Sequence, residues 1–150
     1  MAQIYDPNRY ELRNGVPYLM TRVRMALLAA VEAELAPYGI KGTEYLVLIA
    51  LANGLAETSS GICTIMSCDP GAMTRKIDGL EEKGLVQRVR DPHDRRAIHL
   101  ELTAAGKAVY PKVQATAVGV LNGFLRGFTK SEVRELEQYL KRMLANAPAA

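Results

Sequence analysis

The stretch that decides the fold is residues 69–103, DPGAMTRKIDGLEEKGLVQRVRDPHDRRAIHLELT. Asp69 and Pro70 predict a helix start, because aspartate caps free backbone N–H groups and proline fits the first helical turn. Apolar residues then recur at helical spacing and predict one buried face, made by Met73, Ile77 and Leu80. Gly84 is typical of a helix end. We therefore expect an amphipathic helix over residues 70–83.

A β-hairpin is expected directly after this helix. Residues 85–90, LVQRVR, alternate between apolar and polar side chains, and residues 98–102, IHLEL, do the same. Residues 91–94, DPHD, are typical of a turn. Two short strands around a charged turn predict a hairpin next to the helix.

Working outward, we expect helices on both sides of this unit. Upstream, the apolar pattern predicts an amphipathic helix over residues 17–35 and a buried helix over residues 43–52. Residues 55–69, LAETSSGICTIMSCD, suit one short helix. Downstream, Thr103 can cap a long helix, and residues 129–132, TKSE, fit a capping box that opens the last helix.

These elements predict a mainly α fold with a small β-hairpin, built as one domain over residues 1–150. The net charge of +3 permits nucleic-acid binding without requiring it. The sequence has no phosphate-binding loop and no HExxH or GxSxG motif, so we expect neither an enzyme nor a cofactor. It has no signal peptide and no long apolar run, so we expect a cytoplasmic protein without a membrane span.

The outward face of the helix over residues 70–83 predicts contact with DNA. Gly71 would let the backbone come close, and Arg75 could donate two hydrogen bonds to a guanine edge in the major groove. Thr74 could reach a phosphate, and Lys76 lies on the other shoulder of the helix. We expect Asp78 to hold the guanidinium of Arg75 in place. The alternative is an ordinary solvated helix face with an ion pair.

Arginines gather in the expected hairpin. Arg88 and Arg90 lie on its first strand, and Arg95 and Arg96 follow the turn, with Asp94 beside them as a possible brace. Exposed arginines at a hairpin tip fit the negative potential of a narrow minor groove. The alternative is a hairpin with unrelated surface charge.

Residues 72–109, AMTRKIDGLEEKGLVQRVRDPHDRRAIHLELTAAGKAV, resemble the MarR family of bacterial winged-helix transcriptional regulators. The resemblance rests on the Thr74-Arg75 pair, the helix end at Lys83-Gly84-Leu85-Val86, the Asp94-Arg95-Arg96 hairpin tip and the helix start at Leu102-Thr103. It implies a winged helix-turn-helix lobe over residues 43–103, flanked by dimerisation helices in residues 1–36 and 104–150. It also implies a ligand-responsive repressor that binds a pseudo-palindromic DNA operator as a homodimer.

The resemblance further implies a small aromatic carboxylate or phenolic effector. Tyr18, Arg22 and Tyr38 are the residues we expect near it, although they could equally cover the helix surface. Cys63 and Cys68 could make the protein a redox-sensing regulator, but we expect buried, inert thiols. Two cysteines and two histidines, His93 and His99, are a poor ligand set, so no metal is expected. A protein-binding winged helix would need an apolar or acidic face instead.

Overall fold

The computed structural model describes residues 3–91 and 98–148 and shows a mainly helical chain with one two-stranded antiparallel sheet. The expected fold class is confirmed. In chain order the elements are the 3-10 turn η1 (Leu12–Asn14), α1 (Val16–Leu35), the 3-10 turn η2 (Ala36–Tyr38), α2 (Gly42–Ala52), α3 (Ser59–Met66), α4 (Pro70–Glu82), β1 (Val86–Arg90), β2 (Ile98–Leu102), α5 (Ala104–Phe124) and α6 (Lys130–Ala145).

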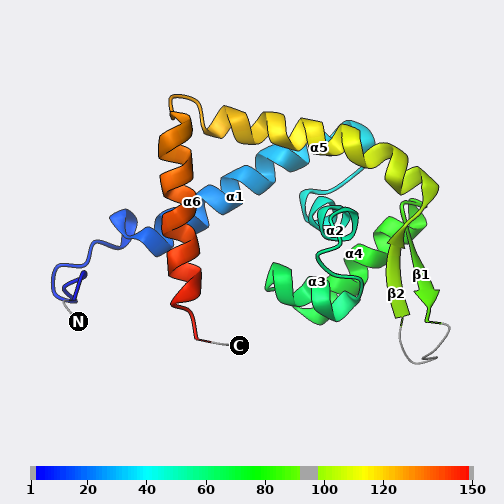
Figure 1. The fold of residues 1–150 in the computed structure, drawn as a ribbon, viewed down its shortest axis with the longest axis horizontal. Helices are drawn as coiled ribbons and strands as arrows, with labels where there is room; N and C mark the ends of the chain where they lie inside the picture. The colour runs from blue at the N-terminus through cyan, green and yellow to red at the C-terminus, as the bar shows by residue number, and fades with distance from the viewer. Residues whose placement is uncertain (1–2, 92–97, 149–150) are drawn as a thin grey trace.

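The molecule has a compact lobe at one end and long helices at the other (Figure 1). The lobe contains α2, α3, α4 and the β1–β2 hairpin. Helix α5 runs from the hairpin toward α6 and packs along α1 on the way. In the hairpin, Arg88 pairs with Leu100 and Arg90 pairs with Ile98.

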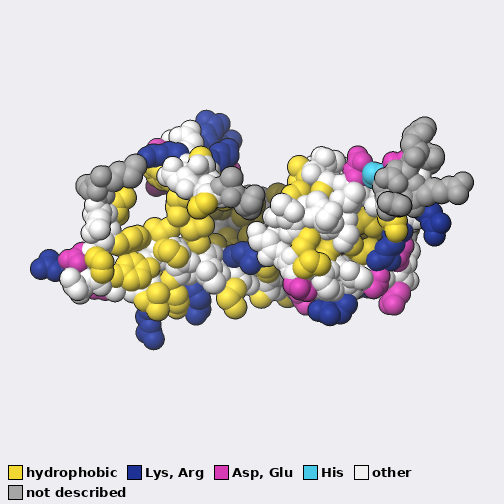
Figure 2. Space-filling view, turned by 90° about the horizontal axis from the view of Figure 1, so that it is seen from below, with side chains coloured by type: hydrophobic (Ala, Val, Ile, Leu, Met, Phe, Trp, Pro, Cys, Tyr) yellow, Lys and Arg dark blue, Asp and Glu magenta, His cyan; other side chains and the backbone are white. Residues whose placement is uncertain are grey.

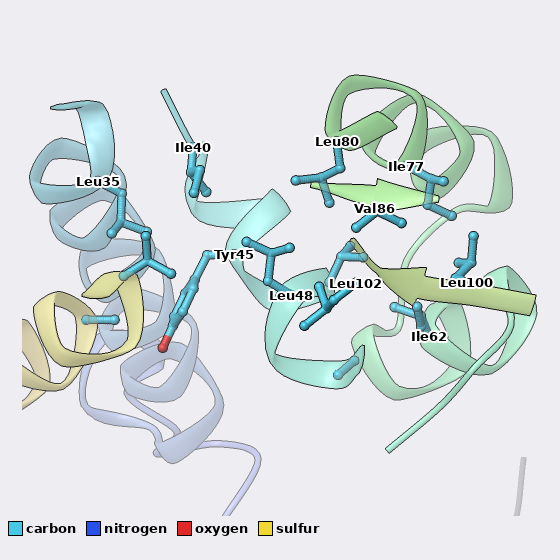
Figure 3. Close-up of a cluster of buried hydrophobic side chains, with 14 of the residues drawn as sticks. Leu35, Ile40, Tyr45, Leu48, Ile62, Ile77, Leu80, Val86, Leu100 and Leu102 are labelled. Atoms are coloured by element: carbon cyan, nitrogen blue, oxygen red, sulfur yellow. The ribbon is translucent and has the colours of Figure 1, made fainter. Parts of the chain in front are cut away.

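The core of the lobe is aliphatic (Figure 3). The three apolar residues predicted for the buried face of α4 are fully buried, as is Ile62 of α3. They pack in one cluster with side chains of α1, α2, β2 and α5, including Leu35, Leu48, Leu100 and Val113. Burial on this scale fixes α4 on the lobe, since each fully buried Leu or Ile contributes roughly 1.5–3 kcal/mol.

The starts of α4, α5 and α6 follow the side-chain caps that the sequence predicts. The carboxylate of Asp69 accepts the N–H of Ala72 at 2.8 Å, and Thr103 accepts the N–H of Gly106 at 3.0 Å. At α6, Thr129 and Glu132 form the expected capping box. The short helix expected within residues 55–69 is α3, and Thr58 caps it by accepting the N–H of Gly61 at 3.1 Å.

The long helices leave much apolar surface uncovered. Figure 2 shows hydrophobic side chains gathered on the part of the molecule away from the hairpin. The exposed set on α1, α5 and α6 includes Leu19, Val23, Met25, Leu121, Phe124, Leu136, Tyr139 and Met143. Helix α6 has no buried residue in the single chain. Within the described residues, no helix combines the length and hydrophobicity needed to cross a membrane.

Candidate DNA-binding surface

Helix α4 presents its predicted outward face to solvent. Gly71, Thr74 and Arg75 are exposed, and Lys76 is half-buried. The Thr74 hydroxyl donates to the carbonyl oxygen of Pro70 at 3.1 Å, which holds its methyl group and oxygen at the start of the helix. Among residues 3–91 and 98–148, no hydrogen-bond or ion-pair partner holds the Arg75 guanidinium. That side chain is therefore available to an external acceptor.

The predicted brace between Asp78 and Arg75 is wrong. Asp78 instead accepts from Nη2 of Arg88 at 2.7 Å. The other terminal nitrogen of Arg88 bonds to Glu81, whose second oxygen accepts the Arg88 backbone N–H at 3.1 Å. Hydrogen bonding to Asp78 raises the pKa of Arg88 above its ordinary value. Arg88 is ten positions from Asp78 in the sequence, and the two side chains meet because β1 packs against α4.

These contacts engage Arg88 within its own chain, whereas contact with DNA was predicted for it. Its guanidinium donates to two carboxylates of its own chain, one from each terminal nitrogen. Its positive charge offsets part of the negative charge of Asp78 and Glu81 in the second half of α4, where bare carboxylates would repel DNA. The same contacts tie β1 to α4 and so set the hairpin's position relative to the helix. The predicted contact of Arg88 with DNA stays a prediction.

The other hairpin residues divide into two groups. Arg90 is exposed at the end of β1, on the side of the turn. Asp94, Arg95 and Arg96 lie outside the described residues, so their predicted contact with the minor groove stays a prediction. The two strands that flank this segment are described, and Arg90 and Ile98 pair at their ends.

A buried carboxylate, which the sequence analysis missed, anchors α4 from behind. Glu44 of α2 is only 4% exposed. Its Oε2 accepts the Lys41 N–H at 2.9 Å and lies 2.5 Å from Nζ of Lys83, just after α4. Gly79 leaves room for this contact, because a Cβ there would lie 2.9 Å from Oε1 of Glu44. One acid on an otherwise apolar helix was the available signal.

The residues predicted for an effector come from two segments: Tyr18 and Arg22 lie about one turn apart on α1, and Tyr38 lies in η2. Tyr18 is half-buried, while Arg22 and Tyr38 are exposed. None of the three lines either of the two main cavities in the described structure. Their role stays a prediction.

The larger cavity has a volume of about 740 Å³ and lies between the end of α2, the hairpin and the start of α5. Its lining combines apolar side chains with Lys107, Tyr110 and His99. Nε2 of His99 lies 3.0 Å from Asp91, and its Nδ1 lies 3.7 Å from Glu57. Sequence reasoning missed this cavity because its wall comes from segments that are distant along the chain.

The cysteines are not buried as predicted. Cys63 and Cys68 are both half-buried, and their sulfur atoms lie 3.5 Å apart. The structure therefore brings the two thiols together at the surface junction of α3 and α4. That the two thiols are inert stays a prediction.

Comparisons with known proteins agree with this geometry. The MarR family model matches residues 40–98, which hold the lobe from α2 to the start of β2. The chain is 31% identical over 111 residues to the multiple antibiotic resistance protein MarR of Escherichia coli K12, covering 73% of this chain and 77% of that protein. The chain belongs to the MarR family. The resemblance expected from residues 72–109 is confirmed.

Two solved structures of this family show the same fold. A cysteine-to-serine mutant of Escherichia coli MarR in complex with operator DNA matches with a TM-score of 0.77 at 27% identity, over 90% of this chain and 99% of that chain. CouR of Rhodococcus jostii RHA1 bound to p-coumaroyl-CoA matches with a TM-score of 0.79 at 26% identity, over 93% of this chain and 99% of that chain. The expected class of winged-helix DNA-binding regulator is confirmed.

Proposed function

We propose that this MarR-family chain is a cytoplasmic repressor that binds a pseudo-palindromic DNA operator as a homodimer, with α4 in the major groove. The observation that carries the proposal is the outward face of α4. Arg75 is exposed and unpaired within the described chain, while Arg88 pairs with Asp78 and Glu81 on the same helix. The N-terminal half of this face therefore presents a free guanidinium, and two of the three acids of α4 are paired with Arg88. No catalytic role is proposed for any residue.

The proposed contacts follow from position along α4. Arg75 reads a base edge, preferably guanine, because its guanidinium can donate two hydrogen bonds there. Gly71, Thr74 and the helix N-terminus approach a phosphate, and Lys76 and Arg90 add contacts that do not depend on sequence. Arg95 or Arg96 enters the minor groove, with Asp94 as its brace.

The homodimer is supported by the apolar surface of α1, α5 and α6. Exposed apolar side chains recur along all three helices, and α6 buries none of its own. Large contiguous apolar patches on a folded chain mark association surfaces. A second copy covering these helices in residues 1–36 and 104–150 would place two α4 helices side by side for two operator half-sites. Occupying a promoter in this way would block transcription.

We also propose a small aromatic carboxylate or phenolic effector, supported by the p-coumaroyl-CoA that CouR binds. Tyr18, Arg22 and Tyr38 would form its site only after a second chain completes it. The 740 Å³ cavity behind the hairpin is the alternative site, since Lys107 could pair with a carboxylate there and Tyr110 could contact a ring. The shift in melting temperature caused by p-coumarate separates these two sites. Arg22→Ala should abolish the shift if the ligand binds at the first site, and Lys107→Ala should abolish it if the ligand binds in the cavity.

The DNA contacts are tested by comparing Arg75→Ala with Arg90→Ala on a set of related duplexes. Arg75→Ala should relax the preference at one base pair in each half-site, by about 1–3 kcal/mol. Arg90→Ala should weaken binding to all duplexes evenly and lower the salt dependence. Equal, sequence-independent losses for both variants would contradict the assignment of Arg75. A protein-binding winged helix remains the alternative, and it would show no duplex binding at all.

A further inference from the structure

Two thiols lie together where the two helices of the helix-turn-helix meet. Cys63 is in the last turn of α3, and Cys68 directly precedes Asp69, the cap of α4. Their Sγ atoms are 3.5 Å apart, and the Cys63 thiol donates to the carbonyl oxygen of Cys68. Both residues are half-buried and free of a disulfide.

The backbone, and not chance side-chain placement, brings these thiols together. The Cys68 N–H donates to the Cys63 carbonyl oxygen at 3.2 Å, and the Ser67 N–H donates to that of Thr64 at 3.3 Å. Ser67 is left-handed, with φ of 48°. This is the hydrogen-bond pattern of a Schellman motif, in which the residues at the positions of Cys63 and Cys68 normally touch. The backbone of the motif therefore places the two cysteines next to each other.

An oxidant can reach one member of the pair from solvent. Cys63 lines a surface groove of about 440 Å³ between α3 and α4, together with Thr58, Ser60 and Thr74. Cys68 is less suited to attack first, because burial, followed by its hydrogen bond with Cys63, raises the pKa of its thiol. Lys76 opposes that rise and Asp69 adds to it. Cys63 is thus the entry point and Cys68 the resolving thiol.

We propose that Cys63 and Cys68 form an oxidation site at which a low-molecular-weight disulfide converts the dithiol to an intrachain disulfide. The Cys63 thiolate attacks one sulfur of the small disulfide, a mixed disulfide forms, and one small thiol leaves with a proton. The Cys68 thiolate then attacks Sγ of Cys63, and the second small thiol leaves with the second proton. Two cysteine thiols are oxidised and one small disulfide is reduced to two thiols.

The consequence for DNA rests on the proposed function. Closing the sulfurs from 3.5 Å to a bond of about 2.05 Å moves Cys68 toward α3. Cys68 adjoins Asp69, whose carboxylate caps α4 through Ala72, so the start of α4 moves with it. Oxidation also removes the hydrogen that Cys63 donates to the Cys68 carbonyl. We expect operator affinity to fall by roughly tenfold, which corresponds to about 1.4 kcal/mol.

The test treats the reduced full-length protein with oxidised glutathione and maps its thiols by mass spectrometry under non-reducing conditions. Wild type should lose both thiols, retain no glutathione and show a Cys63–Cys68 link within one chain. Cys68→Ser should instead accumulate a glutathione adduct on Cys63. Thiols that stay free in the folded protein but react in urea, or links between chains, would overturn the proposal.

The DNA consequence is measured separately, with an operator selected from random duplexes. Oxidised wild type should bind it about tenfold more weakly and recover with dithiothreitol, while the Cys63→Ser/Cys68→Ser double variant should be unaffected. Unchanged affinity with the link formed would overturn the regulatory role alone. If reduced protein binds no duplex, the proposed function fails, and thiol mapping still decides the oxidation site.

Discussion

Removing the buried carboxylate of Glu44 should destabilise the lobe and loosen α4. Glu44 is 4% exposed and binds two groups, the Lys41 N–H at 2.9 Å and Nζ of Lys83 at 2.5 Å. Hydrogen bonds to a charged group contribute about 1.5–3 kcal/mol each. The Lys83 side chain is 33% exposed and regains water after the change, which offsets part of the loss. We therefore expect Glu44→Ala to lower the free energy of unfolding by about 2–3 kcal/mol.

The assay is urea denaturation followed by circular dichroism, at one fixed chain concentration because dimerisation contributes to stability. The matched control is Glu82→Ala, since Glu82 is an exposed acid of α4 that has no ion pair within the described chain. The control should change stability by less than about 0.5 kcal/mol. In thermal melts the Glu44→Ala loss corresponds to roughly 4–12 °C. A Glu44→Ala loss no larger than that of Glu82→Ala would refute the anchoring role of the carboxylate.

Three further predictions concern Arg88, Glu132 and the apolar helices. Arg88→Ala should weaken duplex binding because it leaves the carboxylates of Asp78 and Glu81 unpaired. Adding Asp78→Asn and Glu81→Gln should restore binding. Weak binding by the triple variant would instead indicate that Arg88 contacts a phosphate directly. Hydrogen bonds from Thr129 lower the pKa of Glu132, so the stabilisation of α6 by Glu132 is present above the ordinary carboxyl pKa and is lost as the pH falls through the lowered pKa. Glu132→Gln should flatten the acid dependence of helix content measured by circular dichroism. An unchanged pH profile in this variant would contradict the role of Glu132. Leu136→Glu on α6 should shift the dimer toward monomer in sedimentation, whereas Lys141→Glu on the same helix should shift it less.

The parts of the fold that follow from neighbouring residues could be predicted from the sequence. Asp69, Thr103 and Thr129 each cap a helix through a hydrogen bond that spans three residues, so the local sequence contains the whole interaction. The two strands of the hairpin could be expected because apolar and polar residues alternate in two short segments. Helix α3 was harder to predict, because Gly61 and several Ser and Thr residues lower its helix propensity.

The parts that depend on distant residues could not be predicted in the same way. Glu44 and Lys83 are 39 positions apart, and only the packing of α2 on α4 brings them together. The partner of Asp78 was expected on its own helix, at Arg75, but the guanidinium of Arg88 on the neighbouring strand donates to it instead. Of the predicted DNA-binding set, the α4 residues and Arg90 lie exposed or half-buried at the surface, while Arg88 is engaged within the chain.

Selection of bound duplexes from a random pool tests whether the protein reads DNA as a dimer through α4. We expect enrichment of a pseudo-palindrome whose half-sites are centred about one helical turn, roughly 10 base pairs, apart. We also expect Arg75→Ala to remove the preference at one symmetry-related position in each half. Recovery of no enriched sequence from reduced wild-type protein, or of a motif without two-fold symmetry, would contradict this mode of binding.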